Sequence, residues 1–195
     1  MANSQPLLAR TSTEARLYLD LHPCECGESE LAWASSVVEL DDEDLGSRYD
    51  GTCPSCGTYR EFTFRLPAEI VMPKIGEIVY GDYTPSELLD PGEWMWVADR
   101  YSSSVAADTS GLDEAARRQA RLRVLAAAAA MDEILKFVPP GADRVPTAAF
   151  RTEVGQAVYD EMSGRFDRPR LEVVRDTYRQ IVEEINATVT DPRLR

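Results

Sequence analysis

The chain of 195 residues contains one histidine, His22, and only two lysines, Lys74 and Lys136. It has no run near the roughly 18 consecutive apolar residues that a membrane-spanning helix needs. Its first residues lack a basic stretch followed by an apolar one, which argues against a secretory leader. We therefore expect a protein of the cytoplasm that does not enter a membrane, and cytoplasmic thiols stay reduced.

Motifs of common enzyme classes are also missing. The sequence has no phosphate-binding Walker loop, no Gly-x-Gly-x-x-Gly, no Gly-x-Ser-x-Gly and no His-x-x-x-His pair. The single imidazole lies two residues before a cysteine, where it suits a metal site better than general base catalysis. We therefore predict no catalytic residue from these patterns.

Acidic residues outnumber basic ones by 34 to 21, which gives a formal net charge of −13. Residues 1–66 carry 5 basic and 12 acidic side chains, residues 67–111 carry 2 and 8, and residues 112–195 carry 14 of each. The whole excess thus lies in the first 111 residues. A field of this sign repels phosphate backbones and attracts basic proteins. The use of 19 arginines against 2 lysines, together with many alanines, indicates a bacterial source with a GC-rich genome.

All four cysteines fall into two short pairs, each followed by glycine, in the segments 24–27 (Cys-Glu-Cys-Gly) and 53–57 (Cys-Pro-Ser-Cys-Gly). Zn2+ takes four ligands in a tetrahedron with sulfur at roughly 2.3 Å, so the two sulfurs of a pair must point the same way from one turn. Pro54 presets such a turn, and Gly57 allows the chain to leave it with positive φ. We predict a structural Zn2+ site, because a closed shell of four sulfurs leaves no position for a substrate. The predicted ligands are Cys24, Cys26, Cys53 and Cys56, with His22 as an alternate ligand for the first pair.

The second pair resembles the zinc-ribbon class of knuckles, which implies that each pair lies at the tip of a hairpin. The first pair is one residue tighter than that pattern. Disulfides stay open as an alternative, although Cys24 and Cys26 are too close to bridge easily. Thioredoxin-like redox chemistry needs a pair that opens a helix, whereas a strand pattern follows Cys56. Four unrelated buried thiols are the last alternative.

The first half of the chain reads as a small antiparallel sheet. Leu17, Leu19 and Leu21 alternate with polar residues and predict a strand that leads to the first cysteine pair. Further strands are expected at 31–40, 45–52 and 59–66. So small a sheet buries too little apolar area to stand alone, and the metal is expected to supply the remainder. We predict a zinc-pinned β module at 1–66 and an apolar connector at 67–83.

The second half reads as an α-helical bundle at 84–195, which makes the chain α+β. Helix starts are predicted at 84–87 (Thr-Pro-Ser-Glu) and 90–93 (Asp-Pro-Gly-Glu), because both combine a cap, a proline and a glutamate. A long central helix with five consecutive alanines is expected from 110–113 to about 138. A weaker helix at 147–162 and a last helix after Asp167 complete the bundle, the last with the apolar stripe Leu171, Val174, Tyr178, Ile181 and Ile185.

The favoured hypothesis for function is a non-enzymatic, acidic protein-binding module that captures a basic partner. Small bacterial immunity or antitoxin-type inhibitors provide the analogy. The candidate contact residues are Asp41, Asp42, Glu43, Asp44 and Trp96. A solvated hairpin tip for the acidic run, and a buried side chain for Trp96, are the simpler interpretations.

Two other classes of function stay as alternatives. A nucleic-acid-associated zinc-ribbon regulator would use the one basic cluster of the chain, although a solvated helix face with ion pairs explains that cluster equally. A carboxylate-dependent enzyme would place Glu93, Asp99 or Glu153 in a cleft between the module and the bundle. The basic cluster consists of Arg117, Arg118, Arg121 and Arg123.

Overall fold

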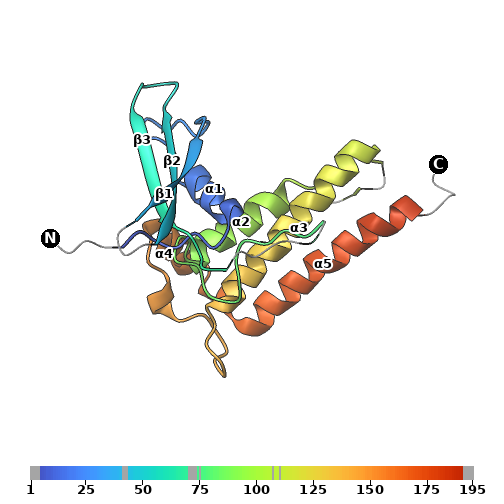
Figure 1. Cartoon of the computed structure of the whole chain (residues 1–195). Helices are drawn as coiled ribbons and strands as arrows, with labels where there is room; N and C mark the ends of the chain where they lie inside the picture. Colours follow the sequence, from blue (N-terminus) through green and yellow to red (C-terminus); the bar gives the residue numbers. More distant parts are fainter. Residues whose placement is uncertain are drawn as a thin grey trace. The chain divides into compact units, whose positions relative to one another are not determined.

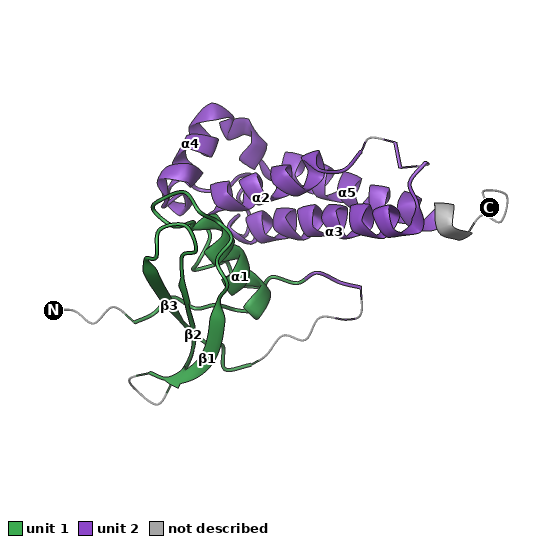
Figure 2. Ribbon diagram, turned by 90° about the horizontal axis from the view of Figure 1, so that it is seen from above, with its two compact units in different colours: residues 1–72, 79–89 green, residues 73–78, 90–195 purple. Residues whose placement is uncertain are grey.

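The computed structural model describes residues 5–40, 44–69, 74, 76–106, 108–109 and 111–190, and side chains as far as residue 187. The chain forms two compact units, one of residues 1–72 and 79–89 and the other of residues 73–78 and 90–195 (Figure 2). A three-stranded antiparallel sheet belongs to the first unit, and the longest helices belong to the second (Figure 1). The predicted α+β class is therefore confirmed.

The sheet of the first unit consists of β1 (Ala34–Glu39), β2 (Leu45–Thr52) and β3 (Tyr59–Arg65), paired in the order β1-β2-β3. The three strands predicted on this stretch are thus confirmed. In the register, Val37 of β1 faces Ser47 of β2, which in turn faces Phe64 of β3. Directly paired residues share a face of the sheet, so these three side chains lie on the same side.

The strand predicted around Leu17, Leu19 and Leu21 is wrong, because residues Ser12–Leu21 form helix α1. The missed signal is Thr11, whose side chain accepts a hydrogen bond from the N–H of Glu14 at 3.1 Å and caps the helix. An alternation over three leucines fits either structure, and here helical geometry buries Leu17 and Leu19 together with Ala15 and Glu14.

Aromatic rings join α1 to the sheet. The ring of Tyr18 lies edge-on to those of Phe62 and Phe64 of β3, with centroids 6.0 and 5.4 Å apart. Tyr49 of β2 packs against Phe64 at 6.0 Å and is itself buried. Edge-to-face contacts at these separations stabilise a small core beyond the apolar area they bury.

A buried ion pair holds residues 79–89 within the first unit. Arg10 and Glu14 are both nearly inaccessible to solvent, and Arg10 Nη2 lies 2.6 Å from Glu14 Oε1. The hydroxyl of Ser86 donates to the same carboxylate oxygen at 2.6 Å. The guanidinium of Arg10 also donates to the backbone oxygen of Thr84. Buried charges need several hydrogen-bonding partners, and both Arg10 and Glu14 have them.

The helix predicted to begin at residues 84–87 is wrong. None of residues 84–89 is helical, although the local sequence has a cap and a glutamate at helical spacing. The hydroxyl of Ser86 instead accepts hydrogen bonds from the N–H groups of Leu88 and Leu89 at 3.1 and 3.0 Å. The glutamate, Glu87, accepts from the N–H of Leu8 at 2.8 Å and lies 3.2 Å from Arg65. The predicted cap, Thr84, instead donates from its hydroxyl to Asp82 Oδ1 at 2.6 Å. Neither member of the expected capping pair is therefore available to start a helix here.

The second unit contains the helices α2 (Pro91–Ser103), α3 (Glu114–Lys136), α4 (Glu153–Glu161) and α5 (Arg168–Thr190), with short 3-10 turns at Thr147–Ala149 and Ser163–Phe166. The predicted start at residues 90–93 is confirmed, because Asp90 and Glu93 form a reciprocal capping box. Asp113 caps α3. The helix predicted at 147–162 is shorter than expected, since α4 begins only after its cap, Thr152.

Four of the five consecutive alanines of α3 are buried, as predicted for a helix at the centre of the bundle. Ala127 and Ala130 have no exposed surface, and Met131 is 1% exposed. Helices α3 and α5 run side by side (Figure 1), and Val124 of α3 packs with Ile185 of α5 in one apolar cluster. Small side chains allow such close helix packing. None of the described helices has a stretch long and apolar enough to cross a membrane.

Candidate metal centre

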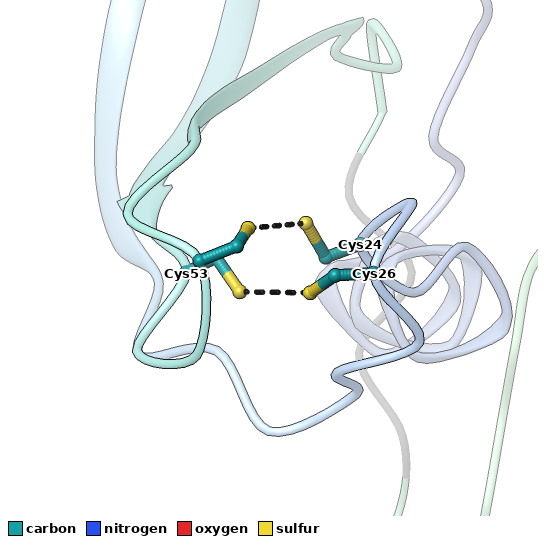
Figure 3. A group of neighbouring side chains, drawn as sticks. Cys24, Cys26 and Cys53 are labelled. Carbon is teal, nitrogen blue, oxygen red and sulfur yellow. Dashed lines mark hydrogen bonds between the residues drawn. The ribbon is translucent and has the colours of Figure 1, made fainter.

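The four cysteines, 27 or more residues apart between the two pairs, meet at one point of the first unit. Their sulfur atoms all lie within 4.8 Å of one another. Two hydrogen bonds cross between the pairs, with Cys24 Sγ 3.5 Å from Cys56 Sγ and Cys26 Sγ 3.6 Å from Cys53 Sγ (Figure 3). The structure therefore brings together the complete set of predicted thiol ligands.

The first pair lies on a turn directly after α1. The N–H of Gly27 donates to the backbone oxygen of Cys24 at 2.7 Å, and the N–H of Cys24 donates to Glu28 at 2.8 Å. Gly27 has a φ of 90°, a conformation that residues with a side chain rarely adopt. The zinc-ribbon resemblance implied a hairpin tip here, and in this respect it is wrong, because a helix rather than a strand precedes the pair.

The second pair lies at the hairpin tip between β2 and β3, as the resemblance implied. The N–H of Cys53 donates to the backbone oxygen of Thr58 at 2.9 Å, and the N–H of Gly57 donates to Cys53 at 2.9 Å. Gly57 has the predicted positive φ, 75°. The sheet register thus fixes the direction in which both sulfurs of this pair point.

The donor atoms fit a tetrahedral metal ion. Four sulfurs at roughly 2.3 Å from a central Zn2+ would lie about 3.8 Å from one another. The Cys24–Cys56 and Cys26–Cys53 sulfurs lie 3.5 and 3.6 Å apart, and all four lie within 4.8 Å of one another. Thiolates select soft or borderline metals such as zinc over calcium or magnesium. The chemistry of the donor set therefore matches a metal held by four sulfurs.

The four thiols differ in exposure and in acidity. Cys24 and Cys53 are buried, whereas Cys26 and Cys56 are exposed. Hydrogen bonds with the side chain and backbone of Thr58 lower the pKa of Cys56 to about 6. A hydrogen bond with the Glu28 backbone lowers the pKa of Cys26, but the bonds that its thiol shares with Cys56 and Cys53 raise it to about 12. A metal ion that binds all four sulfurs must displace the protons that remain.

Two residues that the sequence did not single out link the cysteine turns. The carboxylate of Glu28, after the first pair, accepts a hydrogen bond from Ser55 Oγ, inside the second pair, at 2.5 Å. This bond lowers the pKa of Glu28. The sequence feature that could have identified Glu28 and Ser55 is their position beside the cysteines. Hydrogen bonds of this kind orient the ligand-bearing turns around a metal.

His22 lies beside the cluster but is not one of the groups that converge in it. Its Nδ1 atom lies 2.7 Å from the backbone oxygen of Tyr18, and its ring stacks on that of Tyr18 with centroids 3.8 Å apart. Among the described residues, the group of four potential ligand atoms contains the cysteine sulfurs alone. His22 thus ends α1 and directs the chain into the first cysteine turn.

The residues proposed for partner contact are described only in part. Asp41, Asp42 and Glu43 lie outside the described residues. Asp44 is half-buried, and the amide of Gln5 donates to its Oδ2 at 3.2 Å. Trp96, for which burial was the simpler interpretation, is 40% exposed on α2.

The three carboxylates considered for catalysis have separate environments. Glu93 is buried in the capping box of α2, and burial raises its pKa to about 7. Asp99 binds both Nη atoms of Arg165 at 2.7 and 2.5 Å. Glu153 is exposed at the start of α4. Among the described residues, the cavities of 360 and 260 Å³ are lined by other side chains than these three.

The four arginines of the basic cluster are engaged within the second unit. Arg118 pairs with Glu114 at 2.9 Å, and Arg121 donates to the side chain of Asn186 at 2.8 Å. The guanidinium groups of Arg117 and Arg123 donate to backbone oxygens at 2.9 and 2.8 Å. The hypothesis of a nucleic-acid surface gains no support from a cluster in which each guanidinium group already has a protein partner.

Comparison of the chain with protein-family models, with curated proteins and with solved structures finds no match in any of the three.

Proposed function

We propose that this chain is a zinc-stabilised, acidic protein-binding module that captures a basic protein partner and has no catalytic activity. Small bacterial immunity and antitoxin-type inhibitors are the functional analogy. The observation that carries the proposal is the charge of the first unit. Residues 1–72 and 79–89 contain 5 basic and 15 acidic side chains, a net charge of −10 out of the −13 of the whole chain.

The proposed metal makes the same unit more negative. Four thiolates and one Zn2+ together carry a charge of −2, which brings the first unit to about −12 when all four sulfurs are ionised. Such a concentration of charge on a small unit speeds the encounter with a partner of the opposite sign. It also opposes binding to nucleic acid, whose phosphates carry the same sign.

The role of the metal would be structural. The cluster joins a turn after α1 to the tip of the β2–β3 hairpin, and so closes a loop between segments that the sheet alone does not connect. A four-sulfur shell has no open coordination position for a substrate. Zinc binding by such a site contributes directly to the folding free energy of the small unit around it.

Metal analysis of the purified chain tests the zinc site. We expect one zinc per chain in protein prepared without added metal. The variants Cys24→Ser and Cys53→Ser should lose it, whereas His22→Ala should keep it, because His22 lies outside the sulfur group. Zinc below one-tenth of the protein concentration in every preparation, or zinc that disappears with His22→Ala, would contradict this assignment.

Capture of a basic partner is tested by charge reversal. Proteins that bind the chain in extracts of its native host should include one basic protein, and the purified pair should associate more weakly as the salt concentration rises. The double variant Glu39→Lys and Asp44→Lys should weaken this association. The matched control, Glu183→Lys and Glu184→Lys on α5, has the same change of charge and should not. Equal weakening by both pairs would show that only net charge matters, and recovery of no basic protein would contradict the proposal.

A further inference from the structure

The two outer edges of the sheet differ. The outer edge of β3 is occupied at its end, because residues before α1 pair with Arg65: Ala9 donates to Arg65 at 3.0 Å, and Arg65 donates to Leu7 at 2.9 Å. The outer edge of β1 pairs with no other strand among the described residues. An open edge offers main-chain N–H and C=O groups to an added strand.

The hydrogen-bond pattern shows which residues of β1 face this open edge. Leu40 donates to the backbone oxygen of Asp44 at 2.8 Å, so the pair formed by these two residues is a hydrogen-bonded one. Hydrogen-bonded and non-hydrogen-bonded pairs alternate along antiparallel strands. The even-numbered residues of β1 therefore bond to β2. Ser35, Val37 and Glu39 direct their N–H and C=O groups away from the sheet, toward the open edge.

A pocket of about 360 Å³ lies beside the same residues. Ser35 and Val37 of β1, Ser47 and Tyr49 of β2, and the chain at the start of α1 contribute to its wall, and the residues that follow β3 complete it. Val37 is 67% exposed, an unusual position for a valine in a strand. Peptides that add a strand to a sheet gain affinity from main-chain hydrogen bonds and specificity from pockets that accept alternate side chains. The first unit has both features in one place.

We propose that the outer edge of β1 and the adjacent pocket bind an extended basic segment of a protein partner as a fourth strand. This inference rests on the proposed capture of a basic protein and names the surface that would perform it. Basic residues of the segment would meet a unit of net charge −10, with Glu39 exposed at the end of the strand. Alternate apolar residues would enter the pocket beside Val37. A second copy of this chain is a poorer occupant, because it carries the same charge.

A short synthetic peptide with alternating lysine and valine residues is the probe, and the full-length zinc-loaded chain is the receptor. Fluorescence anisotropy of a labelled peptide gives the affinity, and amide chemical shifts locate the contact. Two further peptides serve as controls. One has the same sequence with every amide N-methylated, so that it keeps its charge but cannot donate to an edge, and the other replaces lysine with glutamate.

Two variants of the chain test the edge and the pocket. Ser35→Pro removes an outward N–H group without breaking a bond to β2, since proline is tolerated at such positions of edge strands. Val37→Lys places a positive charge at the pocket. Its matched control is Val173→Lys on α5, because Val173 is 65% exposed and Val37 is 67% exposed. Zinc content and thermal unfolding of each variant establish that it is folded.

We expect the lysine and valine peptide to bind with shifts at the amides of residues 35–39, and N-methylation, Ser35→Pro or Val37→Lys to weaken it by about tenfold or more. Val173→Lys should leave the affinity unchanged. Equal binding of the methylated and unmethylated peptides would overturn the strand-addition inference but leave capture of a basic partner standing. Self-association that Ser35→Pro abolishes would also overturn it, because a second copy would then cover the edge. If the native basic partner binds the Ser35→Pro and Val37→Lys variants normally, this inference fails while the proposed function survives.

Discussion

Asp90 Oδ2 accepts hydrogen bonds from both the N–H and the hydroxyl of Thr152, each at 2.9 Å, although 62 residues separate the two in sequence. The same oxygen accepts from the N–H of Arg151, and Oδ1 accepts from Gly92 and Glu93. One fully buried carboxylate thus caps α2 and fixes the segment that begins α4. We therefore expect the stability of the second unit to depend strongly on the Asp90 carboxylate.

Replacing Asp90 with alanine should destabilise the second unit by about 3 kcal/mol, because five donors lose their acceptor and most of them stay buried. Chemical unfolding followed by the helical circular dichroism signal measures the effect. The control is Asp176→Ala on the exposed surface of α5, for which we expect a change under about 0.5 kcal/mol. Similar values for the two variants would contradict this account of Asp90.

A side chain at Gly155 should also disrupt this junction. A Cβ atom there would lie 2.1 Å from both carboxylate oxygens of Asp90, which are held in place by their other bonds. Gly155→Ala should therefore cost about 2 kcal/mol of unfolding free energy. Gly164→Ala is the matched control, since a Cβ at that position meets no atom within 4 Å. A Gly155→Ala variant as stable as the control would show that the junction rearranges freely.

The stability of the second unit should fall as pH rises through the range in which Glu93 ionises. Burial raises the pKa of this carboxyl from 4.5 to about 7, so the folded state binds its proton more tightly than the unfolded state does. The stabilisation is complete below about pH 4.5, declines between the two pKa values and is lost above about pH 7.

Glu93→Gln should flatten this dependence, because glutamine keeps an acceptor for the Asp90 N–H without a charge. At pH 8 the variant should be more stable than the parent by on the order of 1–3 kcal/mol. Unfolding measured at several pH values provides the comparison, and an unchanged slope between pH 4.5 and 7 would contradict the assignment to Glu93.

Removal of zinc by a strong chelator should unfold the first unit and leave the helices of the second. The sheet has only three short strands, and the cluster joins its hairpin tip to the turn after α1. Hydrogen exchange followed by mass spectrometry should show loss of protection at residues 45–65 and retention at 114–136. Addition of zinc should restore protection. Equal loss in both regions would contradict an independent role for the metal.

The features that could be predicted from sequence are those that depend on near neighbours or on rare residue types. The spacing of the cysteines identified the cluster, and the Asp90 capping box identified the start of α2, because both signals are complete within a few residues. The signal at residues 84–87 was equally complete but wrong, since Glu87 and Ser86 have partners more than 70 residues away.

The first element, α1, was predicted as a strand for a different reason. Three alternating leucines fit a strand as well as a helix, and only the cap at Thr11 distinguishes the two. The junction between Asp90 and Thr152 left no pattern at all, because each residue taken alone is an ordinary helix cap. Contacts of this kind become visible only when the chain is folded.

The unequal exposure of the four sulfurs gives the cluster one exposed side and one buried side. Cys24 and Cys53 are buried, so a chelator, an alkylating reagent or a competing thiol would meet Cys26 and Cys56 first on its way to a metal bound there. A bound ion would then be released in steps. Its bonds to the exposed sulfurs of Cys26 and Cys56 would break first, and its bonds to the buried sulfurs of Cys24 and Cys53 would break last.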